Sequence, residues 1–200
     1  MSDSSTGPSS TGPSSASPLP LQGRSVALGI CGSIAAYKGA DLCSKLVQLG
    51  ADVTVVMTDA ATKFVGPMTF QALTGRHVVV DPYTHEEGVH VEHIGLADRA
   101  ECFVVAPATA NFLAKAAHGI ADDVLTSSLL AVTCPVLVAP AMNVRMWQHK
   151  AVVRNVATCR ELGYEIAEPG EGFLACRDVG AGRLAEPADI AARVVALLTA

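Results

Sequence analysis

The apolar residues of this chain fall into short uninterrupted runs separated by longer amphipathic stretches. The runs are rich in valine and isoleucine, which is typical of strands buried on both faces of a sheet. They lie at 25–30, 52–57, 102–106 and 136–139, with shorter candidates at 77–80 and 164–167. The longest stretches between them predict helices at 34–49, 111–117, 122–131 and 143–162. This alternation predicts an α/β fold with a single doubly wound, Rossmann-like parallel sheet and helices on both faces.

The first residues differ from the rest in composition. Residues 1–22 are mostly Ser, Thr, Pro and Gly, and so few apolar residues cannot bury enough surface to fold. They also lack the basic start and apolar core of a secretory signal. We therefore expect a disordered tail at 1–22 and one domain at 23–200. The longest apolar region, 129–142, contains two prolines and is shorter than the roughly 20 residues of a membrane span, so we expect no membrane insertion.

Charge and cysteine content narrow the functional classes. The formal net charge of −5 argues against nucleic-acid binding, because proteins of that class carry basic patches. The six cysteines form no CxxC pair. Five of them lie in apolar or helical stretches, which predicts reduced core thiols in a cytoplasmic protein and no metal site. The sixth, Cys176, is surrounded by glycines and charged residues.

Polar residues follow the predicted strands where a doubly wound sheet binds its ligands, beyond the carboxyl ends of the strands. These positions are Gly32-Ser33, Thr58, 107–111 and 140–143. They offer hydroxyls and amides but little charge, which suits a neutral polar ring system and one phosphate. Ser33 is a good helix N-cap, and backbone N–H groups at a helix N-terminus attract phosphate. Plain helix capping explains Ser33, Thr58 and the 109–111 segment equally well.

Three side chains are candidates for chemistry or for substrate binding. His93 lies among apolar residues beside an acid, as a proton-transfer group or a structural histidine does; His85 and His90 compete with it. Asn143 either caps a helix or binds a carboxylate or carbonyl. Glycine-rich residues 172–183 are expected to disfavour helix and strand. We interpret about 169–187 as an irregular C-terminal flap with Cys176 pointing into a site, against the alternative of a surface loop with an incidental thiol.

Five motifs in order resemble one family over about 25–198. They are Gly32-Ser33-Ile34-Ala35-Ala36-Tyr37-Lys38, His93-Ile94 with Leu96, Ala106-Pro107-Ala108-Thr109-Ala110-Asn111, Pro140-Ala141-Met142-Asn143, and Ala175-Cys176 with Gly182-Arg183. Together they resemble the flavin-dependent cysteine decarboxylases, and most closely the branch that acts on phosphopantothenoylcysteine. Phe112 departs from the pattern, since many relatives have Thr after the Asn, and this weakens one flavin contact.

The resemblance implies a set of roles. His93 is similar to the active-site histidine, Cys176 to the proton donor of the substrate-clamping flap, and Asn143 to the asparagine that holds the substrate carboxylate. Ala141, Met142, Ala175 and Arg183 would adjoin the substrate. FMN would lie against Gly32, Ser33, Ile34, Thr58, Thr109, Ala110 and Asn111.

The implied reaction is the FMN-dependent oxidative decarboxylation of phosphopantothenoylcysteine to phosphopantetheine in coenzyme A biosynthesis. The family commonly forms trimers, or dodecamers of trimers. Many bacterial relatives continue into a ligase domain that joins cysteine to phosphopantothenate; here we expect a separate ligase upstream in the pathway.

Three other functions remain open. A peptidyl-cysteine decarboxylase would share FMN, His93 and Asn143 but would not need the same flap, so the Ala-Cys and Gly-x-Gly-Arg pattern favours the small substrate. A flavin prenyltransferase would leave Cys176 without an evident role. A non-catalytic regulator that binds a phosphatase carries long acidic extensions or loses active-site residues, whereas here the tail is short and neutral.

Overall fold

The strands form one parallel sheet. The computed structural model describes residues 18–80, 92–173 and 179–199. Its five-stranded sheet has the order β2-β1-β3-β4-β5, with all neighbours parallel. This confirms the predicted doubly wound sheet and puts the reversal of strand order between β1 and β3. The strands are β1 Ser25–Ile30, β2 Asp52–Met57, β3 Cys102–Ala108, β4 Val136–Pro140 and β5 Glu165–Ile166.

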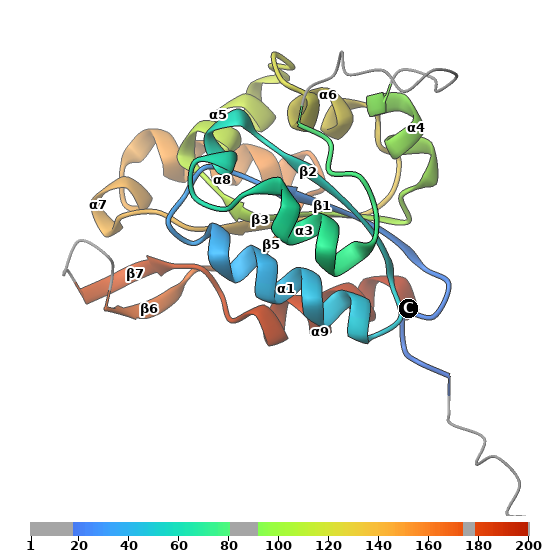
Figure 1. The fold of residues 1–200 in the computed structure, drawn as a ribbon. Coiled ribbons are helices and arrows are strands. Elements are labelled where there is room, and N and C mark those ends of the chain that lie inside the picture. The colour runs from blue at the N-terminus through green and yellow to red at the C-terminus, as the bar shows by residue number, and fades with distance from the viewer. Residues whose placement is uncertain (1–17, 81–91, 174–178, 200) are drawn as a thin grey trace, which may run out of the picture.

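Helices cover both faces of this sheet, as the sequence predicts (Figure 1). One face packs against α1 and α9, and α4, α5, α6 and α8 cover the other. Among the described helices, none is both long and apolar enough to cross a membrane. The helices are α1 Ala36–Gln48, α2 Asp59–Thr62, α3 Pro67–Thr74, α4 Glu92–Arg99, α5 Ala110–His118, α6 Val124–Ala131, α7 Val144–Trp147, α8 Lys150–Glu161 and α9 Pro187–Thr199.

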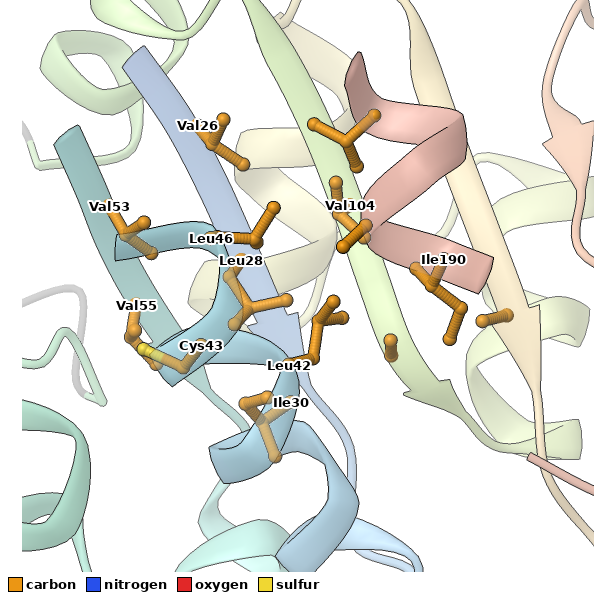
Figure 2. Close-up of a cluster of buried hydrophobic side chains, with 14 of the residues drawn as sticks. Val26, Leu28, Ile30, Leu42, Cys43, Leu46, Val53, Val55, Val104 and Ile190 are labelled. Atoms are coloured by element: carbon orange, nitrogen blue, oxygen red, sulfur yellow. The ribbon is translucent and has the colours of Figure 1, made fainter. Parts of the chain in front are cut away.

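Burial on both faces explains why the strand sequences are almost uninterrupted apolar runs. Leu28 of β1 points toward α1 and α9, where it belongs to the same buried cluster as Leu42 and Ile190 (Figure 2). The next cluster, on the opposite face, takes the alternate residues of β1, beginning with Ala27. The core also includes Leu21, which is fully buried and donates its N–H to the carbonyl of Leu49 at 2.9 Å. The packed core therefore reaches into the segment 1–22.

Three predicted elements differ from the structure by more than a shift of their ends. The single helix expected at 143–162 is two helices, α7 and α8, because the side chain of His149 accepts from the Ala151 N–H at 3.2 Å and starts α8 anew. The third strand does not end before Pro107 but runs on to Ala108 through a register shift. The strand expected at 77–80 is a single bridge between Val79 and Val56.

The C-terminal flap contains regular structure that the sequence did not predict. β6 (Gly170–Phe173) and β7 (Val179–Arg183) pair antiparallel as a two-stranded ribbon. Glycine was expected to disfavour strands here, and that expectation is wrong for these residues because the strands pair with each other. The ribbon extends from the sheet beside α7 (Figure 1). Ala175 and Cys176 lie outside the described residues.

Candidate active site

The loops that follow β1, β2, β3 and β4 meet along one edge of the sheet. The N–H of Cys31 donates to the carbonyl of Pro107 at 3.1 Å, and the N–H of Thr58 donates to Ile30 at 3.1 Å. The N–H of Ala141 donates to Ala108 at 3.0 Å. These bonds join the predicted binding segments into one surface. We call it the strand-end edge, made of 32–34, Thr58, 109–111 and 141–143.

The loop after β1 enters α1 differently from the prediction. The N-cap of α1 is Ala35, without a side-chain cap, and Ser33 instead accepts from the Ala35 N–H through its hydroxyl oxygen at 3.2 Å. The prediction of Ser33 as N-cap is therefore wrong by two residues. Gly32 packs against α2, since a Cβ there would lie 2.5 Å from that of Ala60. The next side chain, Ile34, is 61% exposed and presents an apolar surface at the edge.

Two threonines of the edge cap helices, as one of their two interpretations required. Thr58 accepts from the Ala61 N–H at 3.2 Å at the start of α2. Thr109 accepts from the Phe112 N–H at 3.2 Å at the start of α5, so that Ala110 and Asn111 form the first turn. A capping hydroxyl keeps its own hydrogen as a donor, so capping and ligand binding are compatible.

A buried thiol supports the Thr109 segment. Cys31 is 1% exposed, and burial raises its pKa to about 12, while hydrogen bonds from the Thr109 backbone and hydroxyl oppose that rise. The thiol is therefore neutral near neutral pH and serves as packing beneath the edge. The sequence placed Cys31 in the core, but its contact with Thr109 needed the pairing of β1 with β3.

The segment after β4 connects the edge to the ribbon. Asn143 accepts from the Arg145 N–H at 2.8 Å through its side-chain oxygen and caps α7, which confirms the capping interpretation. Ala141 is buried at 5% exposure. Met142 donates its N–H to the carbonyl of Gly182 at 2.9 Å. That bond fixes the ribbon beside the strand-end edge.

The Gly-x-Gly pattern of the ribbon serves close approach. A Cβ on Gly182 would lie 2.3 Å from the carbonyl oxygen of Met142, and one on Gly180 would lie 2.9 Å from a methyl of Val144. Any larger residue would separate the ribbon from α7 and the Met142 segment. Sequence reasoning singled out these glycines but missed the surface against which they pack.

The remaining candidates are placed only in part. His93 is the second residue of α4, and its side chain lies outside the described residues, as do Ala175 and Cys176. Arg183 ends β7, and its guanidinium lies 3.1 Å from the carboxylate of Glu186. The described residues thus bring together the 32–34, Thr58, 109–111 and 141–143 groups, whereas Arg183 joins them only through the backbone of its neighbour Gly182.

The donor set of the edge fits a phosphorylated ring cofactor. Ser33, Thr58 and Thr109 contribute hydroxyls, and Asn111 contributes an amide; all four side chains are uncharged. The N-termini of α1 and α5 follow the adjacent strands β1 and β3, so two helix starts are available for a phosphate. Ile34 adds exposed apolar surface for a ring. This combination suits a flavin nucleotide.

Comparison with known proteins points the same way. Residues 14–199 match the Flavoprotein family. The coenzyme A biosynthesis bifunctional protein CoaBC of Bacillus subtilis (strain 168) is 52% identical over 170 residues, which are 85% of this chain and 42% of that protein. The chain thus spans about two fifths of the length of this relative.

Two solved structures share the fold over nearly their full length. A PPC decarboxylase, a cysteine-to-serine mutant complexed with pantothenoylaminoethenethiol, is 32% identical with a TM-score of 0.80, and the match covers 88% of this chain and 99% of that one. The FMN-dependent cysteine decarboxylase SpaF is 39% identical with a TM-score of 0.78, over 90% and 97% of the two chains.

Proposed function

The chain belongs to the Flavoprotein family, and we propose that it is an FMN-dependent decarboxylase that converts phosphopantothenoylcysteine to phosphopantetheine in coenzyme A biosynthesis. One observation carries the proposal: the bond from the Met142 N–H to the Gly182 carbonyl holds the flap ribbon of β6 and β7 against the uncharged strand-end edge. A ligand site with a covering segment is what this chemistry requires, because closure excludes water from reactive intermediates. The similarity to a PPC decarboxylase over 88% of the chain supports the same substrate.

We assign the cofactor to the edge itself. Gly32, Ser33, Ile34, Thr58 and the 109–111 segment would hold FMN. Bound FMN would accept a hydride from the carbon that bears the substrate thiol and would return it to the ene-thiol after carbon dioxide has left, so that the reaction needs no outside oxidant. The C=S group of the oxidised substrate would take up the electron pair that remains when carbon dioxide departs. The protein would supply orientation: hydroxyl and backbone donors would bind the phosphate, and Ile34 would offer its exposed apolar surface to the ring.

The substrate would lie between the edge and the flap. Asn143 holds the carboxylate with a neutral amide, which binds it without the full charge that would over-stabilise it. Ala141, Met142, Ala175 and Arg183 would adjoin the substrate. His93 removes the substrate proton or orients the reacting groups. Cys176 donates the final proton to carbon, and the cysteine-to-serine mutant of PPC decarboxylase, complexed with an ene-thiol, supports this role.

The assembly and the location belong to the same proposal. We infer a cytoplasmic homotrimer, or a dodecamer of trimers, supported by large apolar side chains that are exposed in the described chain, among them Ile34 and Tyr37, each 61% exposed. The ligase that precedes this step would be a separate partner or a further domain, as the bifunctional name of the CoaBC relative indicates for that protein.

The test is the visible spectrum of the purified protein, followed by mass analysis of phosphopantothenoylcysteine after incubation. We expect a yellow protein and loss of carbon dioxide from the substrate. Cys176→Ser should accumulate the oxidised, decarboxylated ene-thiol, while Cys134→Ser, a half-buried cysteine before β4, should behave as the wild type. A yellow protein that decarboxylates only peptides ending in cysteine would assign the chain a peptide substrate instead of phosphopantothenoylcysteine. A protein unable to bind FMN would refute the enzyme and favour the regulator.

A further inference from the structure

Three charged side chains meet where β7 leads into α9. The carboxylate of Glu186 lies 3.3 Å from the ammonium of Lys38 and 3.1 Å from the guanidinium of Arg183. Both oxygens of Glu186 accept from Lys38, the second at 3.4 Å. Lys38 comes from the first turn of α1, and Arg183 ends the ribbon. The Glu186 carboxylate thus connects the end of β7 to α1, the helix that follows the loop after β1.

Burial makes this connection more than a surface ion pair. The side chain of Lys38 is 11% exposed, whereas those of Arg183 and Glu186 are 45% and 56% exposed. A cation with so little access to water needs a partner. It also lies near the positive end of a helix dipole, and the first turn of α1 contains no acidic residue. Glu186 therefore provides, from another part of the chain, the negative charge that this helix start lacks.

Arg183 extends the connection across the ribbon. A Cβ on Gly172 would lie 3.6 Å from a guanidinium nitrogen of Arg183 and 3.9 Å from its Cδ. The arginine of β7 therefore rests on the bare backbone of β6. Contacts run without a break from α1 through Lys38, Glu186 and Arg183 to Gly172. The ribbon is thus held by charge on α1, in addition to the bond from Met142 to Gly182 and the packing of Gly180 on Val144.

We propose that Glu186 is a positioning residue for the decarboxylation, which holds the base of the flap ribbon in register with α1 and fixes the Arg183 guanidinium against β6. This inference rests on the proposed function and adds a residue that none of the five motifs includes. Glu186 does not touch the reacting atoms. It acts through Lys38 and Arg183, so its loss should weaken substrate binding more than it slows the chemical step.

The variant Glu186→Gln, in the FMN-loaded full chain, separates these effects. Losing a charge-assisted contact of this kind should raise KM about tenfold and leave kcat within about twofold of the wild type. FMN content and spectrum should not change. Higher salt should raise the KM of the wild type toward that of the variant, because the carboxylate is partly exposed. The control is Glu171→Gln, which removes the same charge from an exposed position of the same ribbon and should leave KM unchanged.

A second readout needs no substrate. Amide hydrogen exchange, followed by mass spectrometry on peptides covering 140–145 and 179–183, reports the docking of the ribbon directly. In Glu186→Gln these amides should exchange about tenfold faster, as expected when a local opening loses one charged contact. If the wild type fails to decarboxylate the substrate, the proposed function falls, and exchange still decides the role of Glu186.

A double variant covers the case in which Glu186→Gln leaves Lys38 as an unpaired buried charge and unfolds the protein. Lys38→Met with Glu186→Gln removes both charges at similar volume, a change that buried ion pairs often tolerate. It should fold, bind FMN and show the same rise in KM and exchange rate. Unchanged KM and exchange in folded variants, or equal loss of kcat and FMN in them, would overturn the proposal.

Discussion

At the scale of single residues, the site depends on positions where a side chain is absent. Gly182 has a φ of +148°, which residues with a Cβ rarely adopt. Its Cα faces the Met142 carbonyl so closely that a Cβ would lie 2.3 Å from that oxygen. Backbone strain and steric overlap therefore act at the same residue. A side chain at position 182 would therefore weaken the contact that keeps the flap at the strand-end edge.

Gly182→Ala should therefore undock the ribbon. We expect a loss of about 1–3 kcal/mol in the free energy of unfolding of the docked ribbon, measured by hydrogen exchange, since strain and overpacking each cost this much. Substrate KM should rise with it. The control is Gly75→Ala, which has a positive φ of +67° but nothing within 4 Å of the added Cβ. If Gly182→Ala and Gly75→Ala affect the 179–183 amides equally, close approach is not the reason for the glycine.

At the scale of elements, the junction of α5 and α6 is held by a charged cluster behind the edge. The ammonium of Lys115 lies 2.6 Å from Asp122 and 2.9 Å from Asp123, and only 16% of its side chain is exposed. Asp123 also caps α6 in a reciprocal pair with Thr126. Burial acts to raise the pKa of Asp123, but hydrogen bonds from Lys115 and Thr126 outweigh it and lower the pKa below its usual value. The pKa of Lys115 shifts in the matching direction: burial acts to lower it, but the bonds to the two carboxylates outweigh burial and raise it above its usual value.

The lowered pKa makes the stability of this junction depend on pH. A carboxyl whose pKa falls on folding adds stability above its unfolded value of about 3.9, and that stability is lost as pH falls through the folded value. Asp123→Asn should remove about 1–2 kcal/mol near neutral pH and flatten the acid limb of the curve. Urea unfolding between neutral and acidic pH measures both effects. Asp98→Asn, at an exposed position of α4, should change neither; an acid limb unaltered by Asp123→Asn would show that the cluster is not its source.

At the scale of the whole molecule, the site lies at the reversal of strand order between β1 and β3. Because α1 and α9 cover one face and α4, α5, α6 and α8 the other, the loops at the carboxyl ends emerge between the two layers (Figure 1). Each loop is tied to its neighbour by a backbone bond. A cofactor at this edge would contact segments from both halves of the sheet and so stabilise the entire domain.

FMN should therefore raise the melting temperature. Free FMN at one hundred times its Kd adds about 2.7 kcal/mol to the native state, and a chain of this size gains roughly 2–4 °C per kcal/mol. We expect a rise of about 5–10 °C in circular dichroism melts at fixed protein concentration. Riboflavin, which lacks the phosphate, should give a smaller rise. Equal shifts with both compounds would show that the starts of α1 and α5 do not bind the phosphate.

Local causes set the strands and most helices of this chain, whereas long-range contacts set the rest. The strands and most helices were predictable because strands buried on both faces need apolar residues at nearly every position, and such runs are visible in the sequence. The break between α7 and α8 was not predictable, because a capping histidine is a weaker signal of a helix start than Gly or Pro is of a helix end. The pairing of β6 with β7 was hidden because each glycine-rich strand is stabilised only by the other. For the site, the sequence located the loops but not the contacts among them.

By itself, the sequence determined the α/β class, the parallel sheet and the polar loops at the strand ends, since these follow from the local order of apolar and polar residues. Only the tertiary structure decided that Gly182 packs on Met142, that Cys31 supports Thr109, and that Glu186 joins Lys38 to Arg183. Such contacts join residues up to 148 positions apart. They depend on how strands and helices pack in space, and no local pattern of residue types records that geometry.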